Sequence, residues 1–178
     1  MHLHKRIMLG INVLGGTAVI SSYVYGFLTN PTDSGSLWGG IPDSMKPFYV
    51  TSMFMAAAGY FLYSYFLLFR ANPNVIRVAR WFGFSIFNMI YVLILFPSAL
   101  WMPLTFKMIA APNPLLSIAI RLILWCIGLF SLILVIALLC LRPRKPAIAY
   151  WLAVVGSIVF FVQTGILDAI IWVIHFPA

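Results

Sequence analysis

Runs of apolar residues, separated by short polar and charged stretches, make up most of the chain. Five of them are long enough to cross a bilayer as helices, at about 6–28, 48–69, 81–106, 115–141 and 146–176. Each matches or exceeds the roughly 20 residues that span the hydrocarbon core. The runs lack the alternation of barrel strands, and backbone groups in lipid must bond within their own segment. The pattern therefore predicts an all-α integral membrane bundle of five transmembrane helices, in a single domain over 1–178.

Composition supports this fold class and narrows the chemistry. Hydrophobic residues fill 63% of the 178 positions and charged residues only 8%, against about 25% charged in soluble domains. The only acids are Asp33, Asp43 and Asp168, too few for chemistry that needs several convergent carboxylates. The sequence has no nucleotide-binding loop, nucleophile elbow or cysteine pair, and its three histidines do not form a metal-ligand pattern. An enzyme is therefore the least favoured class, and we expect no metal site.

The net charge of +8 is informative because the positions of the cations along the chain predict how the helices are oriented in the membrane. Lys46 and Lys107 fall on one side of the expected membrane. Eight others fall at the chain start or in the two connections of the opposite side: Lys5, Arg6, Arg70, Arg77, Arg80, Arg142, Arg144 and Lys145. The positive-inside rule then predicts a cytoplasmic N-terminus and a C-terminus outside. In a bacterium the protein would lie in the plasma (inner) membrane, and cations confined to its loops do not predict a nucleic-acid partner.

The connection between the first two helices, Thr29 to Pro47, is the only one long enough to fold over the outer end of the helices. It begins with turn-forming residues and then places Trp38 before a pair of glycines. One interpretation is an interfacial loop that holds Trp38 in the aromatic belt of the membrane. The other is a lid over a pocket open to the outer side. The cytoplasmic connections are short and contain prolines, which predicts tight turns.

Two ionisable residues fall inside the predicted spans, Arg121 in the fourth and Asp168 in the fifth. The turn between these spans centres near Arg144, 23 residues after Arg121 and 24 before Asp168. In an antiparallel hairpin this symmetry places both at the same depth, so we predict an intramembrane ion pair between them. The pair could be a structural clip, or it could present charge to a ligand in a cavity.

Helical spacing extends the polar face around Asp168. Thr164, Trp172 and His175 follow at i−4, i+4 and i+7, so a regular α-helix predicts them on the same face. Gln163 lies about 100° round the helix from that face.

Other polar and small residues in the spans predict helix packing. Ala18, Ser22 and Gly26 recur every four residues in the first span, the small-residue stripe that lets helices approach closely in lipid. Asn12 and Asn88 are isolated amides, for which we expect hydrogen bonds between helices.

The segment from Phe96 to Met108 resembles the third helix of the TspO/translocator-protein family of tryptophan-rich membrane proteins, which ends in a similar Leu-Trp-x-Pro-x-x-Phe sequence. The specific match covers Leu100 to Phe106. The resemblance implies a five-helix bundle with a cavity under the first loop that binds tetrapyrroles or sterol-like ligands. It also implies that Trp38, Trp101 and Trp125 line or cover that pocket.

Two functions follow as alternatives. The first is a ligand-binding membrane protein with a tetrapyrrole, sterol-like lipid or pigment in a cavity under the first outer loop. Its candidate ligand-binding residues are Trp38, Trp101, Arg121, Trp125, Asp168 and Trp172. The second is an accessory subunit of a larger membrane complex, in which the helices serve as packing surfaces. Partners would be the bilayer itself and a second copy or other membrane subunits. A transporter is less favoured, because no inverted repeat is visible.

Overall fold

A computed structural model describes residues 2–31 and 34–176, so the acidic residue Asp33 lies outside the described part of the chain. It confirms the predicted all-α class, with five helical segments long and apolar enough to cross a membrane. Three of them are single α-helices: α1 (Leu3–Thr29), α3 (Ser85–Ala110) and α4 (Pro114–Leu139). The second is α2 (Lys46–Tyr65), which continues as the π-helical segment η3 (Phe66–Arg70). The fifth joins α5 (Ala147–Phe161), the π-helical segment η4 (Val162–Trp172) and α6 (Val173–His175).

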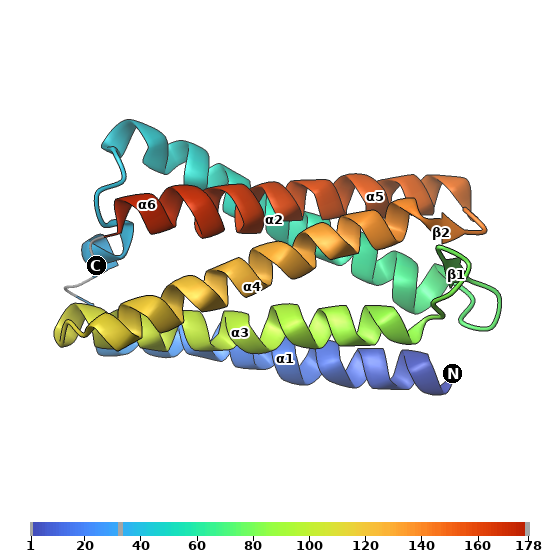
Figure 1. Ribbon diagram of the computed structural model, residues 1–178, viewed down its shortest axis with the longest axis horizontal. Coiled ribbons are helices and arrows are strands. Elements are labelled where there is room, and N and C mark those ends of the chain that lie inside the picture. Colours follow the sequence, from blue (N-terminus) through green and yellow to red (C-terminus); the bar gives the residue numbers. More distant parts are fainter. Residues whose placement is uncertain (1, 32–33, 177–178) are drawn as a thin grey trace.

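The helices form two pairs with one helix crossing between them. Helix α1 packs along α3, and α2 packs along α5. Helix α4 runs diagonally from the α3 side at one end to the α5 side at the other (Figure 1). The start of α1 and the end of α6 lie at opposite ends of the bundle, as an odd number of crossings requires (Figure 1).

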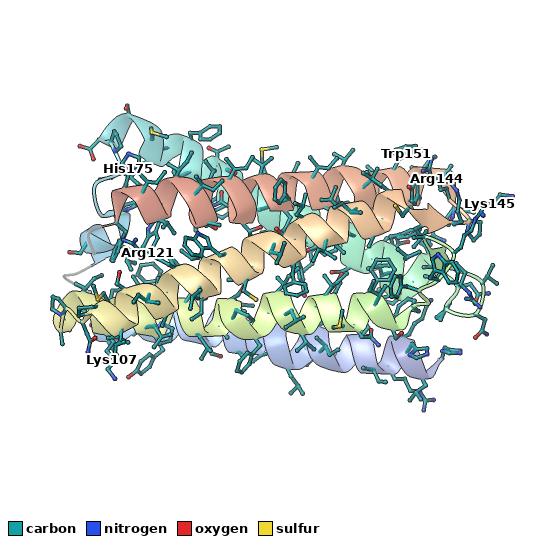
Figure 2. All side chains as sticks on the ribbon, viewed as in Figure 1. Lys107, Arg121, Arg144, Lys145, Trp151 and His175 are labelled. Carbon is teal, nitrogen blue, oxygen red and sulfur yellow. The ribbon has the colours of Figure 1, made fainter. Side chains whose placement is uncertain are left out.

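The two ends of the bundle differ in character. We call the end that holds the start of α1 and the connections 71–84 and 140–146 the basic end. It carries the eight cations that the sequence grouped together. The opposite end, which we call the loop end, holds residues 34–45 of the first loop and the short turn before α4. Figure 2 shows Arg144 and Lys145 at the basic end and Lys107 and His175 at the loop end. Which end faces the cytoplasm stays a prediction.

The connections at the basic end are more ordered than the predicted tight turns. Residues Arg77–Val78 (β1) pair antiparallel with Leu141–Arg142 (β2), so the second and fourth connections are joined. Because the chain from Arg77 to Phe84 is used in this pairing and the turn after it, the third helix begins at Ser85 rather than near Trp81 as predicted. It also ends later, at Ala110.

Small residues set the closest contacts between helices. A Cβ on Gly59 of α2 would collide with the backbone carbonyl of Gly156 in α5, so these two helices touch backbone to backbone. In the predicted stripe of α1, Ser22 and Gly26 are buried while Ala18 is exposed. A Cβ on Gly26 would lie 2.7 Å from the Phe106 ring of α3.

The isolated amides make the predicted hydrogen bonds between helices. Asn12 Oδ1 in α1 accepts from the hydroxyl of Tyr60 in α2 at 2.6 Å. Asn88 Nδ2 in α3 donates to the carbonyl of His4 in α1 at 3.3 Å. Both bonds join elements that are distant in sequence, which is how polar groups inside a membrane bundle are satisfied.

Candidate ligand site beneath the first loop

The first loop folds back over the loop end of the bundle. It contains two short 3-10 turns, η1 (Ser34–Trp38) and η2 (Asp43–Met45). The Leu37 side chain is buried, and its carbonyl oxygen accepts a hydrogen bond from Trp172 Nε1 at 2.8 Å. Ile41 is also buried. The loop is therefore a docked cover that is tied to the far end of the chain.

Two glycines allow this close approach. Gly39 has a positive φ of 54°, which most residues with a Cβ avoid. A Cβ there would also lie 3.0 Å from the carbonyl oxygen of His175. The next residue, Gly40, donates its backbone N–H to that same oxygen at 2.8 Å. The glycine pair thus fixes the loop against the end of the fifth helix.

Aromatic rings fill the space under the cover. Trp101 of α3 and Trp172 of η4 meet edge to face, with ring centroids 5.7 Å apart. Trp172 also stacks on Phe176 at 4.1 Å. Trp38 lies at the edge, with its ring centroid 6.0 Å from that of Tyr49. The structure therefore brings together Trp101 and Trp172, two of the candidate ligand-binding residues, and places Trp38 in the cover against Tyr49.

The floor of the site is the π-helical segment η4. Residues five apart are neighbours there, and Gln163 Nε2 donates to Asp168 Oδ1 at 2.8 Å. Tyr49 donates its hydroxyl to the carbonyl of Leu167 at 2.6 Å, and Trp125 Nε1 donates to that of Ala169 at 2.9 Å. Side chains from α2 and α4 thus hold the backbone on both sides of Asp168.

Two polar atoms near this floor lack a protein partner. Trp101 Nε1 and Gln163 Oε1 are buried and make no hydrogen bond among the residues that the structure describes. The Tyr23 ring lies 6.0 Å from that of Trp101, and the Tyr49 hydroxyl bonds the carbonyl of Leu167, the residue before Asp168. Asp168 itself is half-buried.

We call this set the Asp168 cluster. It comprises Tyr23, Tyr49, Trp101, Gln163, Asp168 and Trp172. Its unused donors include the buried Trp101 indole N–H, and Gln163 and Asp168 have unused acceptor capacity. Such an arrangement can receive a polar group that both accepts and donates hydrogen bonds. An ionisable residue in a span also marks a functional site by default.

Arg121 and Asp168 do not form the predicted ion pair. Within the described ranges, 2–31 and 34–176, the only ion pair joins Lys46 Nζ to Asp43 Oδ1, at 2.6 Å at the loop end. The sequence argument matched the depths of Arg121 and Asp168 but assumed a regular α-helix. In the π-helical segment the neighbour of Asp168 is instead Gln163, at i−5, which supplies its hydrogen bond. Arg121 remains half-buried on α4.

The π-helical register also corrects the predicted polar face. Thr164 donates its hydroxyl to the carbonyl of Phe160 and contacts Ser131 Oγ at 2.8 Å, away from Asp168. His175 Nδ1 contacts the carbonyl of Ile171. Of the three residues predicted to share the face, only Trp172 belongs to the Asp168 cluster.

Trp125 is the predicted ligand residue that lies furthest from the interior. Its side chain is 52% exposed on α4, although its indole nitrogen reaches the backbone of η4. Sequence reasoning missed Tyr23, Tyr49 and Gln163 as members of the site. Gln163 could have been found as the nearest amide to an intramembrane carboxylate, whereas Tyr23 has no distinguishing signal among the chain's 29 aromatic residues.

The chain matches no protein-family model, no curated protein and no solved structure. The class that its fold defines is a multi-pass helical membrane protein with five spans.

Proposed function

We propose that the protein binds a hydrophobic ligand by one polar head group, which is received by the Asp168 cluster under the first loop. The observation that carries the proposal is the presence of two buried, unpartnered polar atoms, on Trp101 and Gln163, in the same cluster as an intramembrane carboxylate. Unsatisfied polar groups are costly in an apolar interior, so a partner for them would stabilise the bundle.

The aromatic rings around the polar groups indicate that the rest of the ligand, beyond its polar head group, is apolar. Trp101, Trp172 and Tyr23 present ring faces and edges beside the polar floor, and ligand sites combine apolar walls with a few placed polar groups. The resemblance to the TspO family, which includes Trp101, supports a tetrapyrrole or sterol-like body. Because Trp172 stacks on Phe176 under the cover, a ligand as broad as a tetrapyrrole requires the loop to move.

The test is to purify the protein in mild detergent and identify what accompanies it, by absorption spectrum and by mass spectrometry of an organic extract. Protoporphyrin IX, added to the purified protein, tests the tetrapyrrole class through quenching of tryptophan fluorescence. The variant Trp101→Phe removes the indole N–H and keeps a ring, and we expect it to weaken binding about tenfold, as loss of one buried hydrogen bond implies. Trp151→Phe, at the half-exposed Trp151 of the basic end, is the matched control.

The outcomes separate the proposal from its alternative. Equal binding by both variants would place the ligand elsewhere. A protein that carries no small molecule and is recovered only together with other membrane subunits would instead favour the accessory-subunit function.

A further inference from the structure

A second site lies at the basic end, far from the Asp168 cluster. A pocket of about 620 Å³ opens between the end of η3, the turn that follows it and the turn that leads into α5. Its polar lining comes from Arg70, Asn72 and Lys145, and its apolar lining includes Ile76, Pro146 and Ala147. No residue of the proposed function contributes to it.

The pocket is built into the fold. The pairing of β1 with β2 joins the two connections that form its walls. Asn72 Oδ1 accepts the backbone N–H of Asn74 at 3.1 Å, which fixes the turn on one side. Ile76 is buried and anchors the same turn to the core. The walls are therefore held by contacts that do not involve the cations.

The pocket's two cations are available to a ligand. Arg70 and Lys145 are exposed, and their side chains make no hydrogen bond or ion pair with any residue in the described ranges. The Arg70 guanidinium lies 5.5 Å from the Tyr65 ring centroid, a position that leaves its N–H edge free.

Other arginines at this end are engaged by the protein. Arg77 donates to the carbonyls of Asn74 and Ile76, at 3.3 and 2.9 Å. Arg144 donates to the carbonyl of Leu139 at 2.8 Å and lies over the Tyr150 ring. Arg70 and Lys145 thus differ from Arg77 and Arg144, whose guanidinium groups already donate to protein carbonyls.

The surroundings favour an anion. Asp43 and Asp168, the acidic residues that the structure describes, both belong to the loop half of the bundle. The basic residues beside the pocket add to its positive potential: Figure 2 shows Lys145 and Arg144 projecting at this end. An anion here meets attraction from several charges and no nearby carboxylate from the described chain.

The depth of the pocket favours a lipid. Arg70 is the last residue of one spanning segment and Ala147 is the first of another, so the pocket lies where helices leave the hydrocarbon. Trp151, half-exposed about one turn into α5, is typical of the membrane interface. The apolar lining from Val75 and Pro146 suits the glycerol and first acyl carbons, which a free phosphate does not possess.

We infer that this pocket binds the phosphate group of an anionic phospholipid, with Arg70 and Lys145 contacting its oxygens and the apolar lining contacting its glycerol end. Basic pockets between transmembrane helices recognise anionic headgroups in this way. The guanidinium can pair two phosphate oxygens at once, while the ammonium acts as a point charge. On the predicted orientation, the pocket faces the cytoplasmic leaflet.

The experiment is a native mass spectrometry titration of the full chain in a neutral detergent. The probes are phosphatidylglycerol, phosphatidylcholine of the same acyl chains, and inorganic phosphate. We expect saturable binding of phosphatidylglycerol, weaker binding of phosphatidylcholine and no competition by millimolar phosphate. Competition by phosphate as effective as that of the lipid would overturn the lipid assignment and leave a free-anion site.

Variants then locate the binding. The double variant Arg70→Gln/Lys145→Gln should weaken phosphatidylglycerol binding about 30-fold, since two interfacial cations are removed. The control Lys46→Gln/Lys107→Gln makes the same change in net charge at the loop end and should leave binding within about twofold. Equal losses in both would show a response to net charge alone and would overturn the site.

A third variant tests the pocket without altering charge. Ala147→Trp fills the space between the two connections, and Ala147 is exposed, so the helix itself tolerates the larger side chain. We expect it to reduce phosphatidylglycerol binding while circular dichroism stays unchanged. A folded variant with unaltered binding contradicts the proposal.

Discussion

At the loop end, the polar side chains are enclosed by segments that are far apart in sequence. At the basic end, by contrast, the charged side chains extend outward from short connections. The indole of Trp172 reaches the carbonyl of Leu37, 135 residues away, and Tyr49 reaches the carbonyl of Leu167, 118 residues away. At the basic end, Arg77 and Arg144 bond carbonyls within five residues. These side-chain hydrogen bonds are therefore long-range at the loop end and local at the basic end, where the backbone pairing of β1 with β2 supplies the long-range contact.

This difference predicts how each end responds to substitution. Enclosed groups at the loop end hold the cover, the π-helical segment and α3 in one arrangement, so changes there should reduce stability. Exposed cations at the basic end interact with what surrounds the protein, so changes there should alter lipid binding while the fold persists. Each end can be tested against a matched position in the other.

The largest effect is expected for Trp172→Ala. It removes a buried ring that packs on Trp101 and Phe176, together with the bond to Leu37. Loss of a buried Trp costs about 3–5 kcal/mol, so the thermal midpoint in detergent should fall sharply and the first loop should become sensitive to protease.

The matched control is Trp81→Ala at the basic end. Trp81 is 87% exposed, so its removal should change stability by less than about 0.5 kcal/mol. If both substitutions lowered the midpoint equally, the two ends would not differ as proposed.

A smaller loss is expected for Gly39→Ala in the cover. The left-handed backbone at this position costs a residue with a Cβ about 1–2 kcal/mol, and the new Cβ would press on the His175 carbonyl. Unfolding in detergent, followed by circular dichroism, measures the change. Gly35→Ala in the same loop is the control, because a Cβ there meets nothing within 4 Å; a comparable loss at Gly35 would rule out this explanation.

The fold was predictable because it follows from two features of the sequence, the length of the apolar runs and the placement of the basic residues. Apolar runs of sufficient length determine the number of spans, and the alternating placement of basic residues assigns each connection to an end. The boundary near Trp81 was wrong because the chain at Arg77 pairs with Arg142, a contact between two connections that no run length reveals.

The site was predicted in part. Trp101 and Asp168 were identifiable as an aromatic and a charge inside spans, and Trp172 by its helical spacing. The hydrogen-bond partner of Asp168 could not be predicted, because it depends on the π-helical register of η4. A shift from α to π spacing changes which residues are neighbours: Gln163 replaces Thr164 beside Asp168. Such a shift depends on packing against α2 and α4, which periodicity along one helix cannot show.

A stabilising change of smaller size is expected at the basic end for Ala79→Gly. Ala79 has a φ of +48°, close to that of Gly39 at the loop end, but carries a Cβ. Relief of the left-handed conformation should outweigh the added entropy of the unfolded chain, with a net gain of about 0.5 kcal/mol. Thermal unfolding should show a higher midpoint. Ala149→Gly, within α5, should instead lose about 0.5–1 kcal/mol; losses at both positions would contradict the prediction.

The smallest expected effect is the coupling between Arg121 and Asp168, measured by a double-mutant cycle with Arg121→Gln and Asp168→Leu. Because no ion pair joins these residues, their effects on stability should add to within about 0.5 kcal/mol, whereas breaking a buried ion pair would cost about 3–5 kcal/mol. A parallel cycle with Gln163→Met and Asp168→Leu should show coupling of about 1 kcal/mol or more, from the hydrogen bond that the structure contains. Stronger coupling to Arg121 than to Gln163 would restore the ion pair and remove the acceptor capacity that the ligand site requires.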